Sequence, residues 1–109
     1  MLNIQIIHIP SNARDFHSWA AMLNYNCIGN VHLQIEPNKK LKLLDAWVQP
    51  EHRRKGIYRL LWHTRWDFIQ QKYKGYLSYA WCKPKSLPLA IEKGFDSGDT
   101  CVYVSTTVL

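Results

Sequence analysis

The chain holds few of the residues that build disulfide frameworks and metal sites. Its three cysteines, Cys27, Cys82 and Cys101, are an odd number and show no CxxC spacing. The sequence therefore predicts neither a disulfide framework nor a zinc cage. The five histidines show no spacing that indicates a metal site, so we expect isolated core or surface histidines and no metal.

Long apolar runs and targeting segments are also missing. No uninterrupted apolar segment approaches membrane-spanning length, and the N-terminus lacks a basic region followed by a long apolar run. We therefore expect no membrane partner and a location in the reducing cytoplasm.

Acidic residues are scarce, with 8 Asp and Glu against 14 Lys and Arg. The excess is concentrated, because residues 39–93 hold thirteen of the basic and four of the acidic residues, a net charge of +9. Such a field favours an anionic partner, which could be RNA, DNA, a phosphate-bearing cofactor or an acidic protein. Charge alone does not choose among them.

The 109 residues, 47% of them apolar, predict a single globular domain over residues 1–109. β-branched residues and period-two alternation predict strands over residues 2–9, 18–25, 28–36, 41–48, 76–81 and 100–108. Turns are expected at Asn26, Cys27 and Gly29 and again at residues 37–40. The nearly continuous apolar run at 41–48 predicts burial on both faces and a central place in the sheet.

From Gly56 the apolar period changes from two to about 3.6 residues. The expected apolar face consists of two stripes: Ile57, Leu60, Leu61, Thr64 and Phe68, and beside them Tyr58, Trp62, Trp66, Ile69 and Tyr73. A face this wide predicts that the helix lies against a sheet and stops near Gly75. With a short helix within residues 83–95, the order predicts an α/β mixed sheet whose long helix joins two parallel strands.

The stretch "PEHRRKGIYRLL", residues 50–61, stands where a buried strand gives way to this helix. Gly56 lets the backbone approach a ligand, and the unpaired N–H groups of a helix start attract anions. Arg53, Arg54 and Lys55 around it suit a pyrophosphate better than one carboxylate. The stretch is neither a Walker loop nor a GxGxxG fingerprint.

Two segments resemble one family. "LLDAWVQPEHRRKGIYRLL", residues 43–61, is similar to the acetyl-CoA-binding signature of the GCN5-related N-acetyltransferases, the GNAT family, and "AIEKGF", residues 90–95, resembles its closing helix-to-strand signature. The resemblance covers residues 18–107, with the family's N-terminal helical region largely absent. It implies the GNAT-like acyl-CoA N-acyltransferase fold, a central mixed sheet with a long helix after the central strand and a short C-terminal helix.

The resemblance also implies how acetyl-CoA binds. The backbone N–H groups of residues 54–58 would hold the pyrophosphate, and neighbouring parallel strands that splay apart would leave amides for the pantetheine arm. The implied cofactor-binding residues are Trp47 and Val48 through their main chain, Arg53 and Arg54 through their charge, and Lys55, Gly56, Ile57 and Tyr58 in the loop.

Acetyl transfer needs a base for the amine and a donor for the leaving thiolate. Asp45, the carboxylate nearest to the expected splay, could be the base, directly or through water, or it could pair a lysine at the surface. Tyr79 and Ser86 could protonate the thiolate, or serve in core packing and helix capping.

The chain departs from the family at three places. Tyr58 stands where the loop has Gly or Ala, so its ring crowds the phosphate or turns outward. The frequent tyrosine of the last helix is replaced around Ile91, and "KPKS" replaces an asparagine before that helix.

Three functional readings follow. The first is an acetyl-CoA-dependent N-acetyltransferase that modifies a primary amine. With so short an N-terminal region the acceptor site is expected to be open, which suits a protein or peptide amine or a site completed by a second subunit in a homodimer. The second is a CoA-binding protein with weak catalysis that works through contacts to another macromolecule. The third is a small basic nucleic-acid-binding domain, although the helical spacing of Trp62, Trp66 and Tyr73 favours packing over base stacking.

Overall fold

The computed structural model describes residues 3–11, 15–81, 87–97 and 103–109. Its elements, in chain order, are β1 (Gln5–Pro10), β2 (Phe16–Leu23), β3 (Asn26–Glu36), β4 (Lys40–Val48), the short 3₁₀ helix η1 (Pro50–His52), α1 (Ile57–Lys72), β5 (Leu77–Trp81), α2 (Leu87–Glu92), β6 (Asp96–Ser97) and β7 (Tyr103–Thr107). The predicted order of elements is confirmed, and β6, too short to show a period, is added to it.

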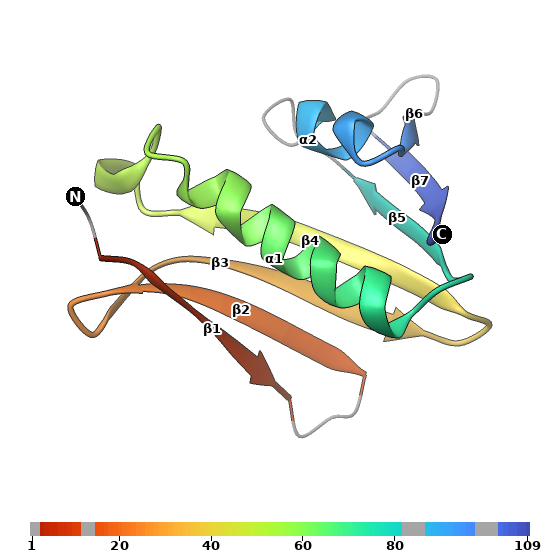
Figure 1. The fold of residues 1–109 in the computed structure, drawn as a ribbon, viewed down its shortest axis with the longest axis horizontal. Coiled ribbons are helices and arrows are strands. Elements are labelled where there is room, and N and C mark those ends of the chain that lie inside the picture. Colours follow the sequence, from red (N-terminus) through yellow and green to blue (C-terminus); the bar gives the residue numbers. More distant parts are fainter. Residues whose placement is uncertain (1–2, 12–14, 82–86, 98–102) are drawn as a thin grey trace.

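The strands form one sheet in the order β1-β2-β3-β4-β5-β7-β6 (Figure 1). β4 and β5 pair in parallel, and the other neighbouring strands pair antiparallel. The expected central place of residues 41–48 is confirmed, because β4 has three strands on either side. The long helix α1 makes the predicted crossover between two parallel strands, so the fold is a mixed α/β sheet.

The expected turn between β2 and β3 is misplaced by two residues. The turn is made by Asn24 and Tyr25, whose φ angles of 51° and 68° are both left-handed, whereas Asn26 and Cys27 already belong to β3. Two left-handed residues match the right-handed twist of the flanking strands, which is the geometry of a type I′ hairpin. Of these two residues only the asparagine is typical of turns, whereas the tyrosine is typical of strands and favoured a longer β2.

Gly29 is a strand residue and not part of that turn. It pairs with Val48 at the end of β4, and a Cβ atom on it would stand 2.8 Å from the carbonyl oxygen of Trp47. A glycine at this position therefore lets β3 and β4 approach closely where the candidate loop begins.

α1 lies across β2, β3 and β4 on one face of the sheet (Figure 1). The predicted apolar face is confirmed for most of its members but is rotated: Leu60 is 43% exposed, and Arg65 is 1% exposed in its place. The buried residues of the helix are Ile57, Leu61, Trp62, Arg65, Trp66 and Ile69.

The segment "AIEKGF" ends α2 and returns the chain to the sheet. The N–H of Phe95 donates to the carbonyl of Ala90 (3.1 Å), and that of Gly94, with φ 90°, donates to Ile91 (3.0 Å). This pair of bonds is a Schellman cap. It places the buried Phe95 against Trp62 and Trp66 of α1, so both helices share one core on one face.

The opposite face of the sheet carries no helix within the described residues. Side chains alternate along a strand, and Val31 and Leu33 of β3 are buried under α1. His32 between them therefore points to the other face, which we call the open face.

β4 leaves its partner β5 halfway along. β5 pairs with residues 40–43 only, and within the described part of the chain residues 44–48 have no strand partner on that side. The two strands diverge there (Figure 1). At the same place β4 holds one residue more than β3, because Asn30 pairs with Trp47 but His32 pairs with Leu44, a β-bulge at residues 45–46.

Candidate functional site

The loop between β4 and α1 presents backbone N–H groups at the start of the helix. Gly56 caps the helix with φ 81°, and Arg54 is also left-handed at φ 64°. Among the described residues none accepts a hydrogen bond from the backbone N–H groups of residues 54–57. Successive amides in such turns form a concave anion site, which the positive end of the helix dipole strengthens.

The basic side chains of this loop divide into two groups. Nε of Arg53 donates to the carbonyl oxygen of Val48 (2.9 Å), which holds this guanidinium against the end of β4. Arg54 and Lys55 are exposed beside these amides. The space above Gly56 is open, since a Cβ there would meet no atom within 4 Å.

Tyr58 takes neither of the two expected positions outright. It is partly buried and packs against the hydrophobic core. The side chain is therefore not turned wholly into solvent.

The end of β4 offers main-chain groups on its free edge. The N–H of Gln49 donates to Ile28 of β3 (2.7 Å), and Trp47 pairs with Asn30. The main-chain N–H and carbonyl groups of successive residues in an antiparallel strand point to alternate edges of that strand. Those of Val48 therefore point to the edge from which β5 has diverged. Of the two residues implied for the pantetheine arm, Val48 lies on that edge and Trp47 faces β3.

Of the three candidate proton-transfer residues, the structure gives the strand positions of Asp45 and Tyr79. Asp45 lies in β4 at the bulge, beside the divergence from β5. Tyr79 lies on β5, and its hydroxyl donates to a carboxylate oxygen of Glu36 (2.5 Å), towards the β3–β4 turn. Ser86 lies outside the described residues.

Two features escaped the sequence reasoning. Arg65 is buried and donates from Nη1 to the carbonyls of His32 (2.9 Å) and Leu44 (2.7 Å). The sequence signal that could have indicated its burial was an arginine lying among the apolar positions of the helix. His32 also contacts the hydroxyl of Ser18 (2.7 Å), a pair 14 residues apart that only the strand register could reveal.

The expectation of isolated histidines is wrong for His8 and His17. Nε2 of His8 lies 2.9 Å from Nδ1 of His17.

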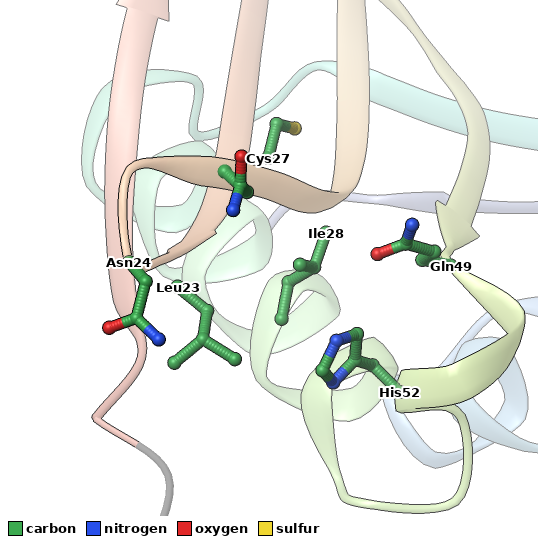
Figure 2. A pocket seen from close by; sticks show the side chains of 7 residues that line it. Leu23, Asn24, Cys27, Ile28, Gln49 and His52 are labelled. Carbon is green, nitrogen blue, oxygen red and sulfur yellow. The ribbon is translucent and has the colours of Figure 1, made fainter.

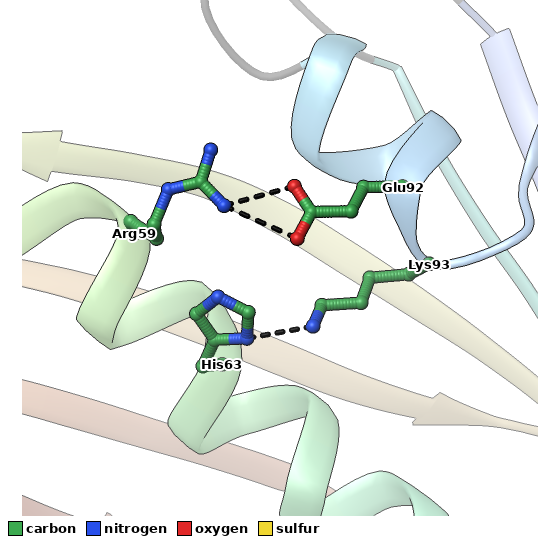
Figure 3. A network of polar contacts seen from close by, with 4 residues as sticks. All are labelled: Arg59, His63, Glu92 and Lys93. Carbon is green, nitrogen blue, oxygen red and sulfur yellow. Dashed lines mark hydrogen bonds and ion pairs between the residues drawn. The ribbon is translucent and has the colours of Figure 1, made fainter.

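Polar contacts tie α2 to α1 beside the loop (Figure 3). Arg59 forms an ion pair with Glu92 (2.8 Å), and Nζ of Lys93 lies 2.6 Å from Nδ1 of His63. The hydrogen bond from Arg59 holds the pKa of Glu92 below its ordinary value. Glu92 and Lys93 belong to "AIEKGF", so the second family-like segment packs on the helix that follows the first.

A pocket of about 620 Å³ lies on the other side of β4, between the β2–β3 turn and η1 (Figure 2). Its lining residues are Leu23, Asn24, Asn26, Cys27, Ile28, Gln49 and His52. Nδ1 of His52 is buried and has no hydrogen-bond partner in the described part of the chain. The pocket is separate from the divergence of β4 and β5.

The described residues also bear on metal binding and on membrane insertion. In the described ranges no three His, Cys, Asp or Glu side chains gather as metal ligands would. None of the helices described is long and apolar enough to cross a membrane.

The chain belongs to the Acetyltransferase (GNAT) family, whose pattern it matches over residues 4–95. That match includes both segments from which the family resemblance arose, the loop before α1 and the end of α2. No curated relative matches the chain.

Solved structures share the fold. The ribosomal-protein-S18-alanine N-acetyltransferase of Escherichia coli superposes with a TM-score of 0.74 at 13% identity, over 89% of this chain and 72% of that one. The PaiA N-acetyltransferase of Thermoplasma acidophilum, solved in complex with coenzyme A, gives 0.70 at 19% identity, over 85% and 61%. GCN5 of Tetrahymena gives 0.67 at 12% identity, over 88% and 70%. The chain thus spans about two thirds of the length of these proteins.

Proposed function

We propose that the chain is an N-acetyltransferase that transfers the acetyl group of acetyl-CoA to a primary amine. The observation that carries this proposal is the set of amides at residues 54–57 that find no acceptor among the described residues, beside the exposed Arg54 and Lys55, beyond the end of β4 that has diverged from β5. The coenzyme A in the Thermoplasma structure of the same fold supports it.

In this proposal the loop binds the pyrophosphate and the strand edge binds the arm. The amides of residues 54–58 and the charges of Arg53, Arg54 and Lys55 face the phosphates. The extended, amide-bearing pantetheine arm would pair with this edge of β4 through the N–H of Val48, as an added strand would, while the carbonyl of Val48 accepts from Nε of Arg53. Residues 44–48 of β4, which β5 does not pair with, would hold the thioester end of the arm in the gap between the two strands.

The reaction forms a bond between the amine nitrogen and the acetyl carbonyl carbon and breaks the bond from that carbon to sulfur. The amine loses a proton to a base, and the thiolate of CoA takes one up. Asp45 is a base candidate because its strand position is beside the divergence. Tyr79 and Ser86 are the donor candidates, and Tyr79 would first have to leave Glu36.

The acceptor has access from the open face. α1 and α2 cover the face on which the loop lies, so an amine can reach the gap between the strands from the other side. Only residues 11–15 join β1 to β2, and no described helix covers this face, which suits an amine on a peptide or a protein. A second subunit is the alternative cover.

The competing readings have less support. A CoA-binding protein without turnover would share the loop and bind CoA, but it would release no thiol with any amine. For nucleic-acid binding, the aromatic residues of α1 would have to be accessible, yet Trp62 and Trp66 are buried.

The test is binding followed by turnover. Calorimetric titration should show binding of CoA and acetyl-CoA, and thiol release should be measured with spermidine, tyramine, lysine amide and a short peptide with a free α-amine. Gly56→Val should abolish CoA binding, because its side chain enters the anion site. Gly75→Val is the matched control: Gly75 also has a left-handed φ, 85°, and open space, but lies at the far end of α1. Equal CoA affinity of both variants and the wild type would refute the assignment of the loop.

A further inference from the structure

His32 is held in one orientation on the open face. Its Nδ1 lies 2.7 Å from the hydroxyl oxygen of Ser18 on the neighbouring strand, and its ring stacks on Phe16 with centroids 5.6 Å apart. A side chain fixed by one hydrogen bond and one ring contact has few other rotamers.

The position of His32 is set relative to the proposed thioester. Its cross-strand partner is Leu44, the first residue of β4 beyond those that pair with β5. Paired residues have Cβ atoms about 5 Å apart and point to the same face. From the helix-covered face, Arg65 of α1 donates hydrogen bonds to the carbonyls of both residues, which fixes the positions of their backbones.

The charge state of His32 follows from its surroundings. Burial lowers the pKa of its imidazole, and the positive charge of Arg65 on α1 lowers it further. From β2 the neighbours are the uncharged Ser18 and Phe16, and from β4 its partner is the apolar Leu44. The ring is therefore neutral at neutral pH, with one nitrogen able to accept a proton.

We infer that His32 accepts the proton of the acceptor amine, directly or through one water, and that Ser18 positions it. This rests on the proposed acetyltransferase function. In this role His32 carries its proton on Nδ1 and donates it to the oxygen of Ser18, so that the lone pair of Nε2 faces the amine. As the amine nitrogen bonds to the acetyl carbon and the bond from carbon to sulfur breaks, the N–H proton passes to Nε2 and then to solvent, and the thiolate takes up a separate proton. His32 thereby takes the role for which Asp45 is the other candidate.

The test compares His32→Gln with His8→Gln, which removes another histidine of lowered pKa from the helix-covered face. With the fastest amine of the panel, His32→Gln should lower kcat by about 100-fold, the usual effect of losing a general base. The same substitution should also remove the acidic limb of the pH profile of kcat/KM, that is, the fall in kcat/KM as the pH is lowered. In the wild type the midpoint of that fall lies below pH 6.5. CoA affinity should not change, and His8→Gln should keep both the rate and the limb.

A second pair of variants guards against loss of fold. Ser18→Ala should lower kcat and shift the acidic limb, and Ser18→Thr, which keeps the hydroxyl, should restore both. His32→Gln with wild-type rate and limb, together with loss of both in Asp45→Asn, would overturn the inference in favour of Asp45. A wild-type chain that binds no acetyl-CoA overturns the proposed function itself, so the two failures are distinct.

Discussion

The Nη1 atom of Arg65 donates a hydrogen bond to the carbonyl oxygen of Leu44 across 2.7 Å, from a side chain that is 1% exposed. The same atom reaches the carbonyl of His32, and the guanidinium lies 4.4 Å from the ring centroid of Trp62. One helical residue thus joins β3 and β4 where their register shifts. The backbone on which the proposed thioester and acceptor meet is fixed by this charge.

Arg65→Met should therefore destabilise the protein well beyond its loss of packing. The methionine fills similar volume but leaves two buried carbonyls without their donor, and two hydrogen bonds to a charged group are worth about 3 kcal/mol. Chemical denaturation would measure the free energy of unfolding. Arg59→Met, on an exposed turn of the same helix, is the control and should change it far less. An equal loss for both variants would mean that the buried bonds contribute nothing.

Arg65 also shows why the fold was predictable and its details were not. Periodicity located α1 and its contact with the sheet, because burial of one face dominates the energy of a helix. It could not foresee that the helix turns so that Leu60 faces solvent and Arg65 faces the sheet. In that orientation Arg65 meets two strand carbonyls beside a β-bulge, and no local pattern in the sequence encodes the position of those carbonyls.

The candidate site divides in the same way. The loop around Gly56 was predictable because a glycine, basic residues and a helix start are contiguous in the sequence. The pair of Ser18 and His32 was not, because residues far apart meet only through the register of β2 and β3. The β2–β3 turn was misplaced because Tyr25 is a rare residue for a left-handed φ.

Gly29→Ala should destabilise the end of β4. The added methyl group would stand 2.8 Å from the carbonyl oxygen of Trp47 and 3.3 Å from side-chain atoms of Leu61 and Val48. Overpacking of this kind costs about 1–3 kcal/mol. Thermal melting would show the loss, and Asn26→Ala, at an exposed position of the same strand, should show little. If Gly29→Ala melts like the wild type, the close approach of β3 and β4 is not required.

The exposed charges of the loop should contribute to CoA binding one by one. Arg54→Gln and Lys55→Gln should each weaken binding about fivefold, on the order of 1 kcal/mol, because each removes one cation beside the phosphates. Added salt should reduce the difference in CoA affinity between each variant and the wild type, because salt screens these exposed charges. Lys74→Gln, just beyond the far end of α1, is the control and should bind CoA as the wild type does. Equal weakening by all three would indicate a general effect of net charge.

The pair of His8 and His17 should make the fold sensitive to mild acid. Both rings pack on Phe68, burial lowers both pKa values below the ordinary 6.5, and the charge of Lys72 lowers them further. In this range the unfolded chain binds more protons than the folded one, so stability is present above pH 6.5 and falls as the pH drops below it. Melting temperatures between about pH 5.5 and 7.5 should rise with pH, and His17→Gln should flatten the slope. A slope that is the same in the variant would assign the acid sensitivity to other groups.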